Sequence, residues 1–225
     1  MRTKITAHSG SEGTPDNSLE FVRYALSLPC DALEADIHMD PGSGVLALGH
    51  DGLNEDSPRL SEVFSLLAEH PVMQINCDLK ERGLEEPVYQ LAEKYAVTDR
   101  LQYSGSVDWK LVAGSRLMAH DVTVLLNAEE VIPGFYEMAR RDLREAEACF
   151  PELIAVCTEW KIPVLNIHYR TAGKKTRELL REAGVGLSVW TVNREEEMEP
   201  FLREEIWSLT TRRPAAALRL RGSIQ

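Results

Sequence analysis

The chain has 225 residues, of which 44% are hydrophobic and 27% charged. This length suffices for one large domain or two small ones, and the apolar content is that of a globular protein, so a mainly disordered chain is not indicated. The formal charge of −11 would repel nucleic acid at long range, so we expect no nucleic-acid partner.

Strand-like and helix-like hydrophobic patterns alternate along the whole chain, without a Gly/Ser-rich linker or a shift in composition. The predicted strands cover residues 4–8, 32–39, 72–80, 101–105, 121–127, 164–169, 186–192 and 206–210. The predicted helices cover residues 19–28, 60–70, 85–96, 107–115, 135–160, 176–183, 194–203 and 214–220. The first of these helices can be capped by Asp16, Asn17 or Ser18.

Eight successive β–α units indicate a parallel sheet, and their presence in one domain, residues 1–225, favours closure into a (β/α)₈ barrel. An open doubly wound sheet is the alternative, but no Gly-rich dinucleotide motif follows the first strand. One segment departs from the alternation. Asp40-Pro41-Gly42-Ser43-Gly44 predicts a turn, and residues 45–50 predict a return strand, so a short hairpin after strand two would carry His50 over the barrel mouth.

Acidic side chains collect on one face of the second and third predicted strands. Because side chains alternate along a strand, Glu34 and Asp36 share a face, and Asp78 and Lys80 share the corresponding face of the next strand. The outer face of a barrel strand is covered by helices, so these polar rows should point inward, toward the end where barrel active sites form. Buried neighbouring carboxylates require a compensating cation.

We therefore expect one divalent metal held by Glu34, Asp36 and Asp78. Ligands that are all oxygen favour Mg²⁺, Ca²⁺ or Mn²⁺ over zinc, without distinguishing among these three. The alternative is a structural ion-pair cluster in which Lys80 and other basic residues neutralise the acids. His8 ends the first strand and His50 ends the return strand, so both should lie at the mouth, where one imidazole can accept a proton and the other can donate one.

Six motifs occur in order along nearly the whole chain: His8-Ser9-Gly10, Pro15-Asp16-Asn17-Ser18-Leu19-Glu20, Glu34-Ala35-Asp36-Ile37-His38, Gly49-His50-Asp51, Asp78-Leu79-Lys80 and Trp190-Thr191-Val192-Asn193. Together they resemble the signature of the glycerophosphodiester phosphodiesterases. The resemblance implies a (β/α)₈ barrel that hydrolyses a small-molecule glycerophosphodiester to glycerol 3-phosphate and an alcohol. It also implies roles in lipid and glycerol metabolism.

The resemblance assigns roles to individual residues. It implies catalysis by His8 and His50, metal binding by Glu34, Asp36 and Asp78, phosphate binding by Lys80, and an apolar wall at Trp190 against the glycerol carbons. Position 9 is also assigned to the substrate site, although Ser9 replaces the usual arginine and lacks its bidentate phosphate clamp. Asp78 and Asp16 each stand where glutamate is usual. Asp16, Asn17 and His168 are further candidate site residues.

Two other functions remain open at the same site. In one, a hydroxyl of the substrate attacks phosphorus and gives a cyclic phosphate, and in the other a non-catalytic barrel binds a phosphodiester. The four cysteines lack the paired spacing of a metal site, and no apolar stretch has the length of a leader or a membrane span. We therefore predict a cytoplasmic protein without stable membrane insertion. A homodimer is possible.

Overall fold

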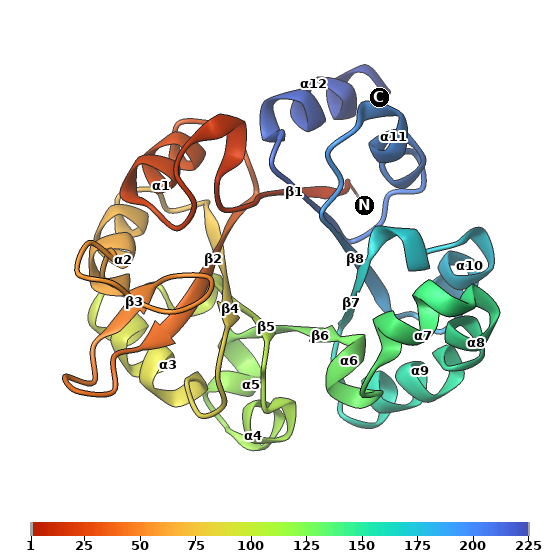
Figure 1. Cartoon of the computed structure of the whole chain (residues 1–225), viewed down its shortest axis with the longest axis horizontal. Coiled ribbons are helices and arrows are strands. Elements are labelled where there is room, and N and C mark those ends of the chain that lie inside the picture. The colour runs from red at the N-terminus through yellow and green to blue at the C-terminus, as the bar shows by residue number, and fades with distance from the viewer. Residues whose placement is uncertain (1, 225) are drawn as a thin grey trace.

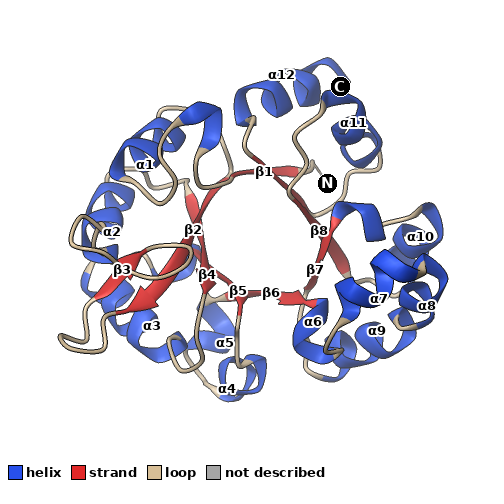
Figure 2. Cartoon of the chain, in the orientation of Figure 1, coloured by secondary structure: helices blue, strands red, loops and turns tan. Residues whose placement is uncertain are grey.

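A computed structural model describes residues 2–224 and shows a closed parallel barrel surrounded by helices (Figures 1 and 2). The eight barrel strands are β1 (Lys4–Ala7), β2 (Ala32–Met39), β4 (Gln74–Leu79), β5 (Leu101–Gly105), β6 (Thr123–Asn127), β7 (Val164–His168), β8 (Gly186–Trp190) and β9 (Ser208–Thr211). The barrel closes because β1 pairs in parallel with both β2 and β9. The predicted (β/α)₈ barrel is confirmed, whereas the single domain over residues 1–225 stays a prediction whose end residues lie outside those described.

The helices form a ring around the strands. Their bounds are α1 (Leu19–Leu26), α2 (Leu60–Ala68), α3 (Glu85–Lys94), α4 (Trp109–Gly114), α5 (Met118–Asp121), α6 (Ala128–Val131), α7 (Phe135–Arg141), α8 (Leu143–Ala148), α9 (Phe150–Glu159), α10 (Lys174–Glu182), α11 (Glu195–Arg203) and α12 (Pro214–Ile224). Three short 3₁₀ helices are η1 (Ser11–Gly13), η2 (Thr98–Arg100) and η3 (Tyr169–Thr171). Among residues 2–224, none of these helices combines the length and apolarity needed to cross a bilayer.

The single helix predicted over residues 135–160 was wrong, because the structure divides this segment into α7, α8 and α9. Asp142 is extended, with φ of −149°, and its carboxylate accepts a hydrogen bond from the Arg144 N–H at 2.9 Å. An aspartate at this position ends one helix and caps the next. Pro151 then lies in the first turn of α9, where a missing N–H costs no helical hydrogen bond.

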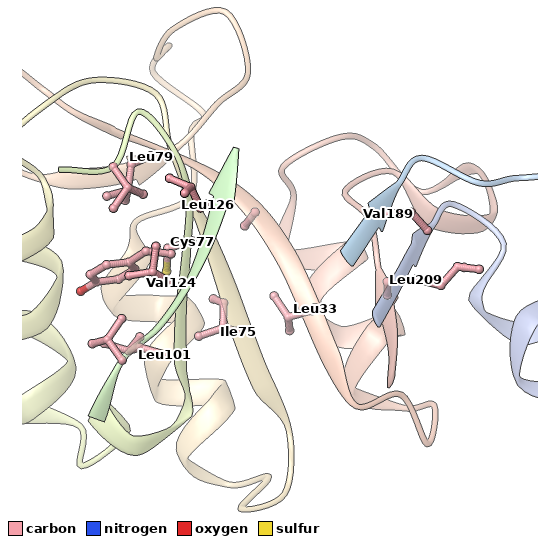
Figure 3. Packing of buried hydrophobic residues seen from close by; sticks show 14 of the residues in the cluster. Leu33, Ile75, Cys77, Leu79, Leu101, Val124, Leu126, Val189 and Leu209 are labelled. Carbon is pink, nitrogen blue, oxygen red and sulfur yellow. The ribbon is translucent and has the colours of Figure 1, made fainter. Parts of the chain in front are cut away.

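The apolar layer lies between the strands and the helix ring, where side chains from one face of each strand are packed (Figure 3). Leu33 on β2, Ile75 and Cys77 on β4 and Leu209 on β9 are completely buried in this layer. Because alternate side chains of these strands point outward, the residues between them must point into the barrel. This parity places Glu34 and Asp36 of β2 on the inner face.

The predicted hairpin after strand two is present. Strand β3 (Leu46–Leu48) pairs antiparallel with the end of β2, with Ile37 opposite Leu48. The turn is closed by Asp40, whose carboxylate accepts hydrogen bonds from the Ser43 N–H and hydroxyl at 2.7 and 2.6 Å. The hairpin projects from the ring beside β2 (Figure 1), and it brings the segment after β3 back to the barrel mouth.

Candidate active site

Three carboxylates from neighbouring strands meet inside the barrel mouth. Glu34 and Asp36 lie on β2, Asp78 lies on β4, and the strand register places Asp36 opposite Asp78. One oxygen from each carboxylate lies within 4.8 Å of the other two. Glu34 and Asp36 are buried, with exposed fractions of 6% and 3%. The structure therefore brings together the three acids that the sequence selected as metal ligands.

Neighbouring side chains hold two of these carboxylates in place. The side-chain amide of Asn17 makes both contacts to Asp36. Its Nδ2 donates to one carboxylate oxygen of Asp36 at 2.7 Å, and its Oδ1 accepts from the backbone N–H of Asp36 at 3.0 Å. On the other strand, the Ser104 hydroxyl donates to Asp78 at 2.6 Å and accepts from the Asn76 amide at 3.0 Å. Each aspartate thus has one oxygen fixed by a neutral donor.

Lys80 contacts the remaining oxygens of the two aspartates. Its Nζ lies 2.6 Å from Asp36 Oδ1 and 2.6 Å from Asp78 Oδ2. This ion pair raises the pKa of Lys80 despite its partial burial. The ion-pair arrangement considered as an alternative to metal binding is therefore present, but it neutralises only part of the cluster. Three ionised carboxylates and one ammonium leave a charge of −2 (−3 + 1).

Burial disfavours the ionised form of Glu34. Burial is the largest of the effects that raise the pKa of Glu34 to about 7; Asp36 and Asp78 act in the same direction, and His8 opposes them. Its carboxylate also accepts a hydrogen bond from the Ser9 N–H at 3.2 Å. A divalent cation among these oxygens would balance the charge of −2, and the donor set is the one that hard cations prefer. The residues present therefore fit a divalent metal.

His8 lies at the end of β1, where its backbone N–H donates to the Thr211 carbonyl at 2.9 Å. Its Nδ1 lies 2.8 Å from the Ser9 carbonyl oxygen and 3.8 Å from a Glu34 oxygen. A carbonyl oxygen can only accept, so the hydrogen bond requires the proton on Nδ1. In the neutral imidazole, Nε2 is then free to accept a proton.

His50 lies two residues after the end of β3. Its Nδ1 is 2.7 Å from an Asp51 oxygen, and its side chain is 65% exposed. The Asp51 carboxylate orients the imidazole through this contact. His8 and His50 line one cavity, as the positions at the ends of their strands predicted.

This cavity has a volume of about 290 Å³ and is lined by the three acids, both histidines, Lys80 and Trp190. Sequence reasoning missed Asn127 and Asn166, which also line it and are joined by a hydrogen bond of 2.7 Å from the Asn166 amide. Asn127 ends β6 and Asn166 lies within β7. Each is a polar residue at a strand position whose side chain points into the barrel, and this alternation could have identified both asparagines.

Several candidate residues lie outside the wall of this cavity. Ser9 is buried, and its hydroxyl accepts a hydrogen bond from the Asn17 N–H at 2.6 Å, so it supports the loop instead of facing the cavity. Asp16 forms an ion pair with Arg212 at 2.8 Å.

His168 packs edge-on against Trp190, with ring centroids 5.4 Å apart, and lines an adjoining cavity. Asn17 reaches the site through Asp36.

The chain is similar to two curated glycerophosphodiester phosphodiesterases, although no family model matches it. A glycerophosphodiester phosphodiesterase of Caldanaerobacter subterraneus is 21% identical over 98% of both chains. One of Bacillus altitudinis is 26% identical over 57% of this chain and 68% of its own length.

Solved structures show the same fold. A candidate glycerophosphoryl diester phosphodiesterase of Agrobacterium tumefaciens aligns with a TM-score of 0.79 and 15% identity over 99% of this chain and 98% of that one. A phosphodiesterase of Oleispira antarctica, solved in complex with the product sn-glycerol-3-phosphate, aligns with a TM-score of 0.69 and 17% identity over 97% and 96% of the two chains.

Proposed function

Because the chain belongs to the glycerophosphodiester phosphodiesterases, a family of enzymes, we propose that it hydrolyses a glycerophosphodiester to glycerol 3-phosphate and an alcohol. The observation that carries this proposal is the convergence of three acids and two histidines on one cavity. The product bound to the Oleispira antarctica relative of similar fold is consistent with this substrate class.

Glu34, Asp36 and Asp78 are the residues that would hold a divalent metal. When bound, the metal would supply positive charge that stabilises the negative charge developing on the phosphoryl oxygens. Asn17 and Ser104 keep the two aspartates oriented, which is the usual role of residues that contact metal ligands. Lys80 adds a cationic donor beside the cluster, where an ammonium group can bind a phosphate oxygen.

The two histidines supply the proton transfers. Water forms a bond to phosphorus while the bond between phosphorus and the alcohol oxygen breaks, and no covalent phospho-enzyme is needed. One imidazole accepts the proton of the water, and the other donates a proton to the departing alcohol. The fixed Nδ1 contacts of His8 and His50 suit this pair of roles because they leave each Nε2 for the reaction.

Trp190 provides an apolar surface beside the polar cluster. Its indole ring packs edge-on against Tyr136, with centroids 5.5 Å apart, and lines the cavity wall. Carbon atoms of a bound diester would be shielded from water on this side. Ser9, Asp16 and Asn17 would act indirectly, by holding the loop between β1 and α1.

Release of glycerol 3-phosphate tests the proposal directly. The purified protein should release it from glycerophosphocholine or a related diester when Mg²⁺, Ca²⁺ or Mn²⁺ is added, and EDTA should abolish the release. Phosphorus NMR of the product distinguishes hydrolysis from cyclisation. Metal binding without release from a broad panel of diesters would overturn the hydrolase assignment and leave a binding function.

We also propose a cytoplasmic location. The four free cysteines, of which Cys30, Cys77 and Cys157 are buried, are compatible with a reducing compartment. Cell fractionation of the native source tests this placement, and recovery outside the cytoplasmic fraction would overturn it.

A further inference from the structure

A second cavity adjoins the first at Trp190, which lines both. It has a volume of about 930 Å³, and we call it the arginine cavity because Arg140, Arg141, Arg144 and Arg170 line it. Its walls come from α6, α7, α8, η3 and the last residues of β7 and β8. It therefore lies at the same end of the barrel as the acid cluster.

The charge of the arginine cavity is opposite to that of the whole protein. None of its four arginines forms an ion pair with an acid in the part of the chain that the structure describes, whereas Arg177 is bound by Glu204. Two acids, Glu129 and Asp142, also line the cavity, which leaves a charge of +2 (+4 − 2) in a protein of −11. Asp142 is moreover engaged as the cap of α8.

An aromatic wall connects the arginines to the acid cluster. The rings of Tyr136, His168 and Trp190 pack edge-on against one another. The backbone N–H of His168 donates to the Tyr136 hydroxyl at 3.3 Å. Burial lowers the pKa of His168, and the charges of Arg170 and Arg140 lower it further. His168 is therefore neutral near pH 7, and the positive charge facing a ligand comes from the guanidinium groups.

We propose that the arginine cavity binds a second anionic group, a phosphate or a carboxylate, on the alcohol arm of the diester. This inference rests on the proposed function, in which the acid cluster and Lys80 engage the phosphodiester itself. The glycerol arm carries only hydroxyl groups, so the second anion belongs to the alcohol. Arginine binds phosphate and carboxylate through paired N–H groups, and it remains charged at every physiological pH.

Two substrates that differ by a single phosphate test the inference. The wild-type protein should have a kcat/KM for glycerophosphoinositol 4-phosphate that is roughly 10-fold or more above its value for glycerophosphoinositol, since hydrogen bonds to charged groups reach this magnitude. The R140Q/R170Q variant should reduce the ratio toward one, and R140K/R170K, which keeps the charge, should retain part of it. R116Q is the matched control, because Arg116 is exposed and outside the cavity.

A binding measurement separates this inference from the hydrolase proposal. In calorimetry, inositol 4-phosphate should bind the wild type and R116Q, and bind R140Q/R170Q roughly 10-fold more weakly, with inositol as the neutral control. Equal binding by all variants, or equal kcat/KM for both diesters, would overturn the arginine site. Absence of turnover with this charge-dependent binding intact would instead overturn the hydrolase proposal alone.

Discussion

Two histidines in this chain have the same local contact but different surroundings. His50 and His120 each bond through Nδ1 to the aspartate that follows, both at 2.7 Å, and both are largely exposed. Only His50 lines the cavity that contains the acid cluster. Comparing His50 with His120 therefore distinguishes the effect of the imidazole–carboxylate contact itself from the effect of its position in the cavity.

We predict that His8→Ala and His50→Ala each lower kcat on a glycerophosphodiester by roughly 10²-fold or more, because each removes a proton-transfer group. His120→Ala should retain the wild-type rate. Steady-state kinetics with the preferred metal, together with circular dichroism to verify folding, provides the measurement. A folded His50→Ala protein with the rate of His120→Ala would remove His50 from the mechanism.

Glu34 should make the metal-free protein less stable as the pH rises. Its folded pKa of about 7, raised by burial, exceeds the ordinary value of 4.5, so the folded state binds the proton more tightly than the unfolded state. The sign of linkage therefore predicts that unfolding free energy is lost between about pH 4.5 and 7, by roughly 3 kcal/mol from this residue. Above pH 7 the buried carboxylate is ionised in both states.

Urea unfolding in EDTA at about pH 5 and about pH 8 measures this effect as the difference between wild type and Glu34→Gln, which keeps an acceptor for the Ser9 N–H. The variant should lose most of the pH dependence, and added Mg²⁺ should restore wild-type stability at the higher pH. Identical pH profiles for the two proteins would contradict the burial argument.

Asn17 should control metal affinity without being a ligand. Its φ of 50° lies in the left-handed region, so glycine can replace it without new backbone strain, and Asn17→Gly removes only the side-chain bonds to Asp36. We expect 10- to 100-fold weaker metal binding, roughly the effect of losing a residue that orients a ligand. Calorimetric titration with Mn²⁺ tests this, and Asn54→Gly, in a surface loop, is the control.

At the level of elements, the hairpin segment after β3 positions His50 through a close backbone contact. A Cβ atom at Gly49 would lie 2.1 Å from the Gly52 carbonyl oxygen, while the Gly49 N–H donates to the Asp36 carbonyl at 3.1 Å. The loop cannot accept a side chain at Gly49 without moving. Any such movement displaces His50, which comes next in the chain.

We therefore predict that Gly49→Ala lowers kcat by roughly 10-fold or more, because small displacements of catalytic groups are costly. Gly42→Ala, in the same hairpin, meets only an Asp40 oxygen at 3.5 Å and should behave as wild type. Kinetics and urea unfolding of both variants give the comparison. Equal rates would show that the loop absorbs the contact.

The strands and the acid cluster could be predicted because both depend on local periodicity. Alternation along β2 and β4 determines which side chains enter the barrel, so Glu34, Asp36 and Asp78 were identified before their contacts were known. The bonds made by Ser9 and Asn17 were not predictable in this way. They depend on a loop conformation with a positive φ at Asn17, and no repeating pattern specifies such a loop.

For the molecule as a whole, a side chain of the last helix links that helix to the segments that begin the first two strands. Arg221 of α12 is 6% exposed, and its guanidinium donates to the Thr3 carbonyl at 2.8 Å and to Asp31 at 2.5 Å. Asp31 in turn accepts from the Ile5 N–H at 2.8 Å. One side chain thus connects α12, β1 and the start of β2.

Arg221→Gln should lower the free energy of unfolding by roughly 2 kcal/mol, the size expected for lost hydrogen bonds to a charged group. Arg219→Gln on the same helix is the control, because Arg219 is 68% exposed and lies 3.8 Å from Glu195. Chemical denaturation of both variants provides the measurement. Equal losses would show that Arg221 contributes no more than a surface arginine.

The pairing of β1 with β9 also orders the events of protein synthesis. All three acids have been translated by residue 78. The backbone N–H of His8, however, donates to the carbonyl of Thr211, so His8 cannot be fixed until β9 has been made and has paired with β1. A chain still emerging from the ribosome therefore carries the carboxylates long before its first imidazole is fixed beside them. Under the proposed mechanism, catalytic competence consequently arises only after residue 211 has left the ribosome.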